Sequence, residues 1–446
     1  MPTYRLPSRR ALLRGLGLAL TGAAAAPLAG CDSGGGSGGS VEGISDIALA
    51  QVARAAPDPA SLPAAVAAVQ AFTADLYRRL AGAAAATGNV VCSPYSVAVA
   101  LAMTRNGARG TTASEMEAVL HAPPLDRWNA GLNTLQGHLD GRAGRRKRQD
   151  GSTATISLDV ANSLWAQRGV TWEGAFLDAL ARDYGSGVHL VDYRADADAA
   201  RTRINAWTST RTHGRIPKLI PSGVLDDFTR LVLVNAIYLK APWEQPFTPA
   251  LTGDAPFTRG DGSRVTVKMM RQSDLTTGYA AGPGWQVVGL AYAGSQLAMA
   301  VIVPDPGRLG ALERSLDGVA LRGMLTGLAP TVVSLSLPRW TFRTQADLKA
   351  VLIALGMPTA FTDKADFSGM TTDEQLLIAA VLHEAFVAVD EEGTEAAAAT
   401  AVVMQELSAP IHQVEVTADR PFLFVIHDVE TGTPVFIGRV ADPTAG

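Results

Sequence analysis

The stretch "EEGTEAAAAT", residues 391–400, directly follows the alternating segment "VLHEAFVAVD", residues 381–390. Alternation is typical of a strand, whereas consecutive alanines favour helix over strand. The alanines then lead into the bulkier "AVVMQELSAP", residues 401–410. Side chains this small can pack almost nothing, so their position directly after a strand calls for a functional explanation.

The composition of the chain is that of a large globular protein. Of its 446 residues, 47% are hydrophobic and 18% are charged, which is enough for a large core, and this length alone would predict two or three domains. The formal net charge of -4 gives no reason to expect a nucleic acid as partner. No internal repeat of about 20 to 50 residues is visible, which argues against solenoids and propellers.

The first 31 residues have the features of a bacterial export signal. Several arginines precede a stretch of small and apolar residues, and no acidic residue occurs before Cys31. "SRRALL" resembles a twin-arginine signal and "LAGC" resembles a lipobox, in which the cysteine is lipidated. We therefore expect residues 1–31 to form a lipoprotein signal peptide that anchors the protein in a membrane through Cys31, on the periplasmic or extracellular face of the cell envelope. Ordinary cleavage near a chance cysteine is the alternative.

A flexible tether is expected after Cys31. "SGGGSGGS" begins at Ser33, and an Ala/Pro-rich stretch, "ARAAPDPASLPAA", follows it. We assign residues 32–63 to this tether and residues 64–446 to the folded body. Cys31 and Cys92 are the two cysteines of the chain, so a lipidated Cys31 would leave no intramolecular disulfide.

Hydrophobic periodicity predicts helices mainly in the first half of the body and strands mainly in the second. Helices are expected at residues 66–80, 172–184 and 200–212, and a short strand followed by two helices at residues 86–120. Strands are expected at residues 153–167, 229–243, 264–270, 285–292, 297–304, 331–342, 381–390 and 421–428. Strands and helices do not alternate regularly, which favours an α+β fold over a doubly wound sheet.

The sequence offers no constellation for catalysis. His383-Glu384 is not followed by a second histidine at metalloprotease spacing, and no Cys/His cluster, P-loop or dinucleotide fingerprint is present. We therefore expect neither a metal nor a cofactor, and not an enzyme, although a hydrolase of unfamiliar design stays open.

The stretch "EEGTEAAAAT" resembles the reactive-loop hinge of the serpins, the serine protease inhibitor family. Other segments resemble the family's signatures and stand in its order: "NVVCSPYSVAVALAMTRNGARGTTASEM", "RLVLVNAIYLKAPWEQPF", "LPRWTF", "DLKAVLIALGMPTAFTDKADFSGM" and "DRPFLFVIHDVETGTPVFIGRVADP". The resemblance spans residues 66–443. It implies one domain with three β-sheets, eight or nine helices and an exposed reactive loop, in place of the two or three domains that length suggests.

The resemblance also implies a mechanism that explains the small side chains. In an inhibitory serpin a protease cleaves the exposed loop, whose N-terminal part then inserts into the main sheet as a new strand and traps the protease as an acyl-enzyme. Gly393 would permit the hinge rotation, and Thr394 and the alanines would enter the sheet without overpacking it. The hinge residues are Glu391, Glu392, Gly393, Thr394, Glu395, Ala396, Ala397, Ala398, Ala399 and Thr400.

Two further readings stay open beside this irreversible inhibition. The protein could be a non-inhibitory serpin that acts as a binding protein or chaperone, or it could inhibit cysteine proteases with the same loop. The small-residue hinge argues against a binding role, because only insertion requires that composition. In each case we expect a monomer.

The resemblance assigns further residues to the opening of the sheet. Four match the family's shutter, the polar cluster beneath the strands that part, and Trp243 matches the tryptophan of the breach, where insertion begins. Two of these positions have a purely structural alternative. His383 could be a buried histidine whose hydrogen bonds are satisfied, and Trp243 could be a large aromatic residue of the core. The four shutter residues are Ser93, Ser96, Asn235 and His383.

The family's spacing places the reactive bond between Leu407 and Ser408. A leucine would enter a broad apolar specificity pocket, so chymotrypsin-like or subtilisin-like serine proteases are the expected targets. A slipped register at Met404, Val403 or Val402 would suit elastase-like proteases instead.

A basic run occupies residues 142–148, in "GRAGRRKRQDG", where a loop after a helix is expected. It could bind a polyanion or an anionic membrane surface, since some serpins bind polyanions near this region. A solvated loop without a ligand is the alternative.

The assigned reactive bond can be tested on the wild-type protein. Cleavage of the loop by a target protease should release a C-terminal peptide that begins at Ser408, because the protease reads the bond after Leu407. Mass spectrometry of the released peptide measures this directly, and a peptide that starts at Gln405 or Val403 would show that the register is wrong.

Overall fold

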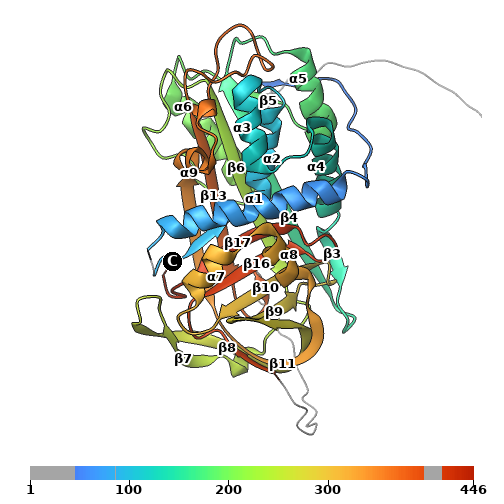
Figure 1. The fold of residues 1–446 in the computed structure, drawn as a ribbon, viewed down its shortest axis with the longest axis vertical. Coiled ribbons are helices and arrows are strands. Elements are labelled where there is room, and N and C mark those ends of the chain that lie inside the picture. The colour runs from blue at the N-terminus through green and yellow to red at the C-terminus, as the bar shows by residue number, and fades with distance from the viewer. Residues whose placement is uncertain (1–45, 86, 396–413, 446) are drawn as a thin grey trace, which may run out of the picture. The chain divides into compact units, whose positions relative to one another are not determined.

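The computed structural model describes residues 46–85, 87–395 and 414–445. They form a mixed α+β fold, as expected, with nine α-helices in this part of the chain (Figure 1). The helices are α1 Leu62–Ala83, α2 Pro94–Arg105, α3 Gly110–Leu120, α4 Leu125–Asp140, α5 Gly174–Ala179, α6 Ala197–Arg211, α7 Leu309–Ser315, α8 Gly318–Thr326 and α9 Lys349–Leu355.

An eight-stranded sheet has the strand order β1-β5-β4-β6-β14-β13-β12, and β3 pairs with β4. Strands β6 and β13 are parallel to each other, and so are β4 and β5, whereas β4 runs antiparallel to β6 and β12 antiparallel to β13. The bounds are β1 Ile47–Ala48, β3 Gly144–Lys147, β4 Thr153–Gln167, β5 Val188–Val191, β6 Leu231–Pro242, β12 Trp340–Asp347, β13 Ala380–Val389 and β14 Gly393–Thr394.

A second sheet has the order β15-β11-β8-β9-β10-β16-β17-β2, and β7 pairs with β8. The long strand β8 pairs with β7 and β11 along one part and with β9 along another, so it joins two of the expected sheets of the described residues into one hydrogen-bonded sheet. The bounds are β2 Val90–Cys92, β7 Gly253–Thr258, β8 Arg264–Gly282, β9 Trp285–Ala291, β10 Leu297–Pro304, β11 Ala329–Pro338, β15 Val414–Thr417, β16 Phe422–Asp428 and β17 Pro434–Val440.

Helix α2 forms the centre of the core beneath the eight-stranded sheet. Every residue of α2 except Arg105 is buried, and the helix packs against β4 and β6. Pro94 occupies the first turn, where no backbone donor is needed, and the Ser93 side chain caps the helix by accepting from the Ser96 backbone N–H. The helix start is therefore fixed directly below the two strands that a hinge insertion would separate.

The N-terminal segment differs from the expected tether. Residues 46–61 lie against the folded body: Ile47 pairs with His189 of β5, the Ala55 backbone N–H donates to Arg182 O at 2.8 Å, and Arg54 donates to Asn133. Without this segment, the edge of β5 would have backbone N–H and C=O groups without partners. A segment can pair with these groups through its own backbone even when its side chains do not favour a strand. The body therefore begins before residue 64, while residues 32–45 lie outside the described part of the chain.

The basic run also differs from the expected loop. Residues 144–147 form strand β3, which pairs antiparallel with the start of β4.

In the part of the chain that the structure describes, no helix is both long and apolar enough to cross a membrane.

Candidate functional site

Two of the predicted hinge residues already lie inside the eight-stranded sheet. Gly393 and Thr394 form β14 between β6 and β13: Thr394 is paired with Ala241 on one side and with Val389 on the other. Below this point β6 and β13 pair directly, from Ala380 to Ala385 on β13. The sheet is therefore parted by the hinge at one end and closed along the rest of the seam between β6 and β13.

Only glycine fits at the point where the hinge enters the sheet. Gly393 has a φ of 152°, a conformation that side chains rarely allow. A Cβ atom here would lie 2.3 Å from Ala241 O and 2.6 Å from the Pro242 Cα. The close approach to β6 thus excludes every other residue without a shift of the backbone.

The residues before Gly393 are fixed by polar contacts. The Asp390 carboxylate accepts from the backbone N–H of Glu392 at 2.9 Å and of Gly393 at 3.3 Å. Glu391 is buried and accepts from the Arg339 guanidinium at 2.8 Å. Burial by itself would raise the pKa of Glu391, but hydrogen bonds from Arg339 and Thr252 outweigh it and lower the pKa. The turn into the hinge is therefore rigidly anchored.

Thr394 and Glu395 contact different parts of the molecule, and Glu395 lies just past the end of β14 with a φ of 52°. The Thr394 hydroxyl is buried and hydrogen-bonds the Tyr292 hydroxyl at 2.6 Å. Glu395 forms an ion pair with Arg215, and its backbone N–H donates to Ala388 O at 2.8 Å. The inward position is thus reserved for a small side chain.

Trp243, the expected breach tryptophan, is buried directly beneath the hinge. Its ring stacks on Tyr292 with centroids 4.6 Å apart, and its indole N–H donates to Asp390 O at 3.0 Å. Its backbone N–H donates to Glu392 O at 2.8 Å. Trp243 therefore supports both the turn before the hinge and the side chain that Thr394 contacts.

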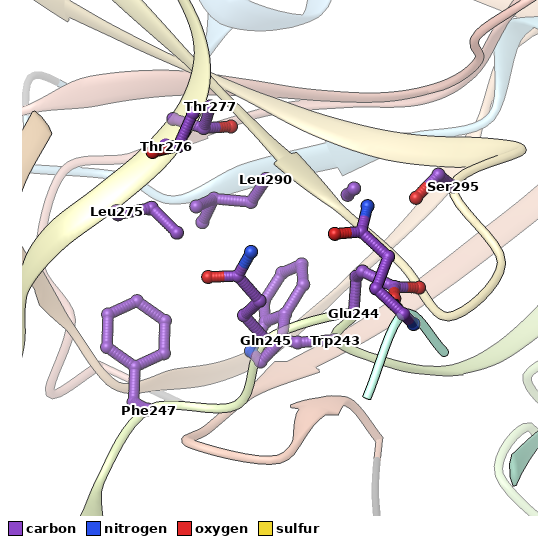
Figure 2. Close-up of a pocket in the computed structure, with 11 residues that line it drawn as sticks. Trp243, Glu244, Gln245, Phe247, Leu275, Thr276, Thr277, Leu290 and Ser295 are labelled. Atoms are coloured by element: carbon purple, nitrogen blue, oxygen red, sulfur yellow. The ribbon is translucent and has the colours of Figure 1, made fainter. Parts of the chain in front are cut away.

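A small pocket opens beside Trp243. Figure 2 shows Trp243, Gln245, Phe247, Leu275 and Leu290 around it, and its cavity volume is about 70 Å³.

The four predicted shutter residues lie together beneath the closed part of the seam. The Ser93 backbone N–H donates to His383 Nε2 at 3.1 Å, and His383 Nδ1 donates to Asn235 Oδ1 at 2.5 Å. Asn235 Nδ2 in turn donates to Ser96 Oγ at 2.6 Å. All four residues are fully buried. The cluster joins β13 and β6 to the start of α2, so it must rearrange when the two strands separate.

One member of this cluster was missed in the sequence. Asn162 of β4 accepts from Asn235 at 2.7 Å and from Ser96 at 2.6 Å. Asn162, Asn235 and His383 are direct cross-strand partners on β4, β6 and β13. The available signal was the asparagine within the predicted strand "TATISLDVANSLWAQ".

His383 is held in its neutral form by this arrangement. Burial lowers its pKa to about 4. Because Ser93 donates to Nε2, the proton must reside on Nδ1, where Asn235 accepts it. A charged imidazole would lose the bond from Ser93 and would be buried without a counterion.

Several predicted site residues lie outside the described residues. These are the lipid anchor Cys31, the hinge residues Ala396, Ala397, Ala398, Ala399 and Thr400, and the reactive bond Leu407-Ser408. Their assignments stay predictions.

The basic run 142–148 is engaged in structural contacts. Arg142 is buried and forms ion pairs with Asp428 and Glu430, and Arg148 donates to the backbone of Trp243 at 2.8 Å. Arg146 bonds nearby backbone carbonyls, including Ala143 O at 2.8 Å. The structure therefore does not support a polyanion site built from the whole run.

Comparison with known proteins gives a consistent result. A family model described as "Serpin (serine protease inhibitor)" matches residues 67–443. An uncharacterized serpin-like protein of Thermococcus kodakarensis is 38% identical over 384 residues, which cover 85% of this chain and 86% of the relative. The leukocyte elastase inhibitor of Homo sapiens is 33% identical over 365 residues, with 80% of this chain and 93% of the relative covered.

Solved structures show the same likeness. The native state of Tengpin, a thermophilic serpin, has a TM-score of 0.76 at 27% identity and covers 88% of this chain and 96% of its own. Thyroxine-binding globulin in complex with thyroxine has a TM-score of 0.74 at 26% identity, with 85% of this chain and 99% of its own covered.

The low pKa of His383 predicts a pH-dependent stability. An unfolded histidine titrates near pH 6.5, so between about pH 6.5 and pH 4 the unfolded chain binds a proton that folded His383 does not, and stability falls as the pH falls. At pH 5 the contribution of His383 to this loss should be about 2 kcal/mol.

Urea midpoints at pH 7.5 and pH 5 measure this effect in wild type and in His383→Gln, whose amide stays neutral. His189 and His427 also have pKa values lowered to about 4 by burial and serve as a common background. The variant should start less stable but lose less on acidification. An equal loss in both proteins would contradict the role of His383.

Proposed function

The chain belongs to the serpin family, and we propose that it is an irreversible protease inhibitor that traps its target by inserting the cleaved reactive loop into the eight-stranded sheet. The observation that carries this proposal is β14: two hinge residues, Gly393 and Thr394, already part β6 from β13. The small residues that follow in the sequence suit a strand that must extend along the same seam.

Insertion would continue the register that β14 has begun. Thr394 lies opposite Ala241, so each later residue would move one position back along β6, and Met404 would lie opposite Leu231, where β6 begins. The direct β6–β13 ladder would be replaced by two antiparallel ladders. About ten added residues, at roughly 1 kcal/mol net per hydrogen bond, could release on the order of 10 kcal/mol beyond the bonds that are lost, less the entropy of ordering the loop.

The inhibitor would act as a suicide substrate. The protease serine attacks the carbonyl carbon of Leu407, the peptide bond to Ser408 breaks, and the protease becomes ester-linked to Leu407. Insertion before hydrolysis of this ester would drag the protease along the sheet and pull its catalytic groups out of register. This chain would contribute no catalytic group of its own.

The same register supports Leu407 as the reactive residue. A protease attached at Val402 or Val403 would stop opposite Leu233 or Val232, within β6, whereas Leu407 would pass beyond the first residue of that strand. Only attachment at Leu407 would place the protease beyond the end of the sheet, where it does not collide with β6. This favours chymotrypsin-like or subtilisin-like targets, while the named relatives that inhibit leukocyte elastase support an elastase-like target.

The fold alone does not decide between inhibition and binding, because thyroxine-binding globulin has the same architecture. What favours inhibition is the composition of the hinge together with the Gly393 contact on β6, which a binding protein does not need.

A cysteine protease is the alternative target of the same loop. We further propose that lipidation of Cys31 anchors the inhibitor at a membrane of the cell envelope, where it would meet its target protease.

The proposal is tested by mixing the purified protein with a panel of serine and cysteine proteases. Trapping should give a band on a denaturing gel whose mass is that of inhibitor plus protease, because the ester survives denaturation. No such band with any protease of the panel would contradict trapping and favour a binding role.

Thr394→Arg should abolish the covalent band while leaving the loop cleavable. The arginine would have to lie against Tyr292 and Trp243 without a buried partner, so insertion would slow and hydrolysis of the ester would win. Thr326→Arg, at the exposed end of α8, is a matched control that should trap normally. Normal trapping by Thr394→Arg would contradict the insertion of this segment.

A further inference from the structure

An exposed aromatic side chain lies at the end of the sheet where β6 begins. Phe228, in the segment between α6 and β6, is 79% exposed, and Val224 in the same segment is 41% exposed. Phe228 is the one aromatic residue among the exposed large hydrophobic side chains of the described residues: Leu49, Val52, Val224, Phe228, Leu251, Val319, Ile353 and Val429.

Local hydrogen bonds hold Phe228 in this exposed position. The Asp226 carboxylate accepts from the Phe228 backbone N–H at 3.1 Å and from the Thr229 hydroxyl at 2.9 Å. Arg230 donates to the Asp227 carbonyl at 2.7 Å. The ring is therefore presented by an ordered turn and not by a loose connection.

The register of the sheet identifies what would reach this turn. Thr394 lies opposite Ala241 on β6, so Met404 would lie opposite Leu231, the first residue of that strand, and Leu407 would lie beyond it, at the end of the sheet where the turn 224–228 leads into β6. The pairing with β13, Thr394 opposite Val389, would bring Val403 opposite Ala380, the first residue of β13, so Leu407 would pass the end of that strand as well. Both ladders thus lead the ester-linked residue to the same place.

The trapped protease would have to contact the end of the sheet where β6 begins. Strand β6 begins at Leu231, opposite Met404 in this register, so three residues would span the distance from the last paired position to the ester. Three extended residues reach about 10 Å. A protease domain of some 220 residues has a radius of gyration of about 17 Å, so its surface around the ester must press on the end of the sheet.

Resting on the proposed function, we propose that the turn 224–228 is the surface against which the captured protease is held, with Phe228 as its apolar contact. Burial of this ring against the protease opposes the return of the protease to its active geometry. The turn would thus act after insertion, by slowing hydrolysis of the ester, and would have no part in the first recognition of the loop.

The test measures how fast active protease is regained from purified complexes. Phe228→Ala should release protease about three- to thirtyfold faster than wild type, the range that loss of one buried aromatic contact produces. Phe228→Leu should stay close to wild type because it keeps an apolar contact. Val319→Ala, which alters an equally exposed side chain on α8, should have no effect.

Two outcomes would overturn the inference alone. Release from Phe228→Ala at the wild-type rate would show that the ring does not hold the protease. A slower first cleavage of the loop in this variant, with unchanged release, would place the contact in recognition instead. Because Phe228 is exposed, the variant should fold normally, and failure of the wild-type protein to form any complex would contradict the proposed function itself and this inference with it.

Discussion

The structure depends on one seam, the ladder between the parallel strands β6 and β13. At one end Gly393 and Thr394 separate these strands, and along the rest the strands bond each other directly. A strand inserted antiparallel between two parallel strands would gain a ladder on both sides, so the closed seam is the less fully bonded arrangement. Under the proposed mechanism, this difference in bonding is the free energy that entry of the loop would release.

Two polar clusters hold the ends of this seam in place. Around the hinge, Glu391 is fixed by Arg339 and Thr394 is bonded to Tyr292. Beneath the closed part, the neutral His383 connects β13 to Asn235 and to Ser93. Because the bonds of His383 are buried and bridge β6 and β13, they would have to be exchanged as the strands part, which would set a barrier against premature insertion.

The sequence predicts the fold class, the order of the elements and the residues at the seam, because motifs that cover nearly the whole body resemble one family. His383 and Asn235 could be assigned in this way, and the structure brings them into contact. Asn162 was missed because its place beside Asn235 depends on the register between β4 and β6, which no local pattern reveals. The edge strand at Ile47 was missed for a similar reason: its backbone pairs with β5, while its side chains give little signal.

The central claim is that the uncleaved protein is metastable and gains stability when the loop inserts. Thermal scans of the intact protein and of protein nicked once in the reactive loop test this most directly. A nick ordinarily loosens a protein because it adds chain freedom. Insertion worth on the order of 10 kcal/mol should instead raise the unfolding midpoint by tens of degrees. An unchanged or lowered midpoint in the nicked protein would contradict insertion and, with it, trapping of the protease.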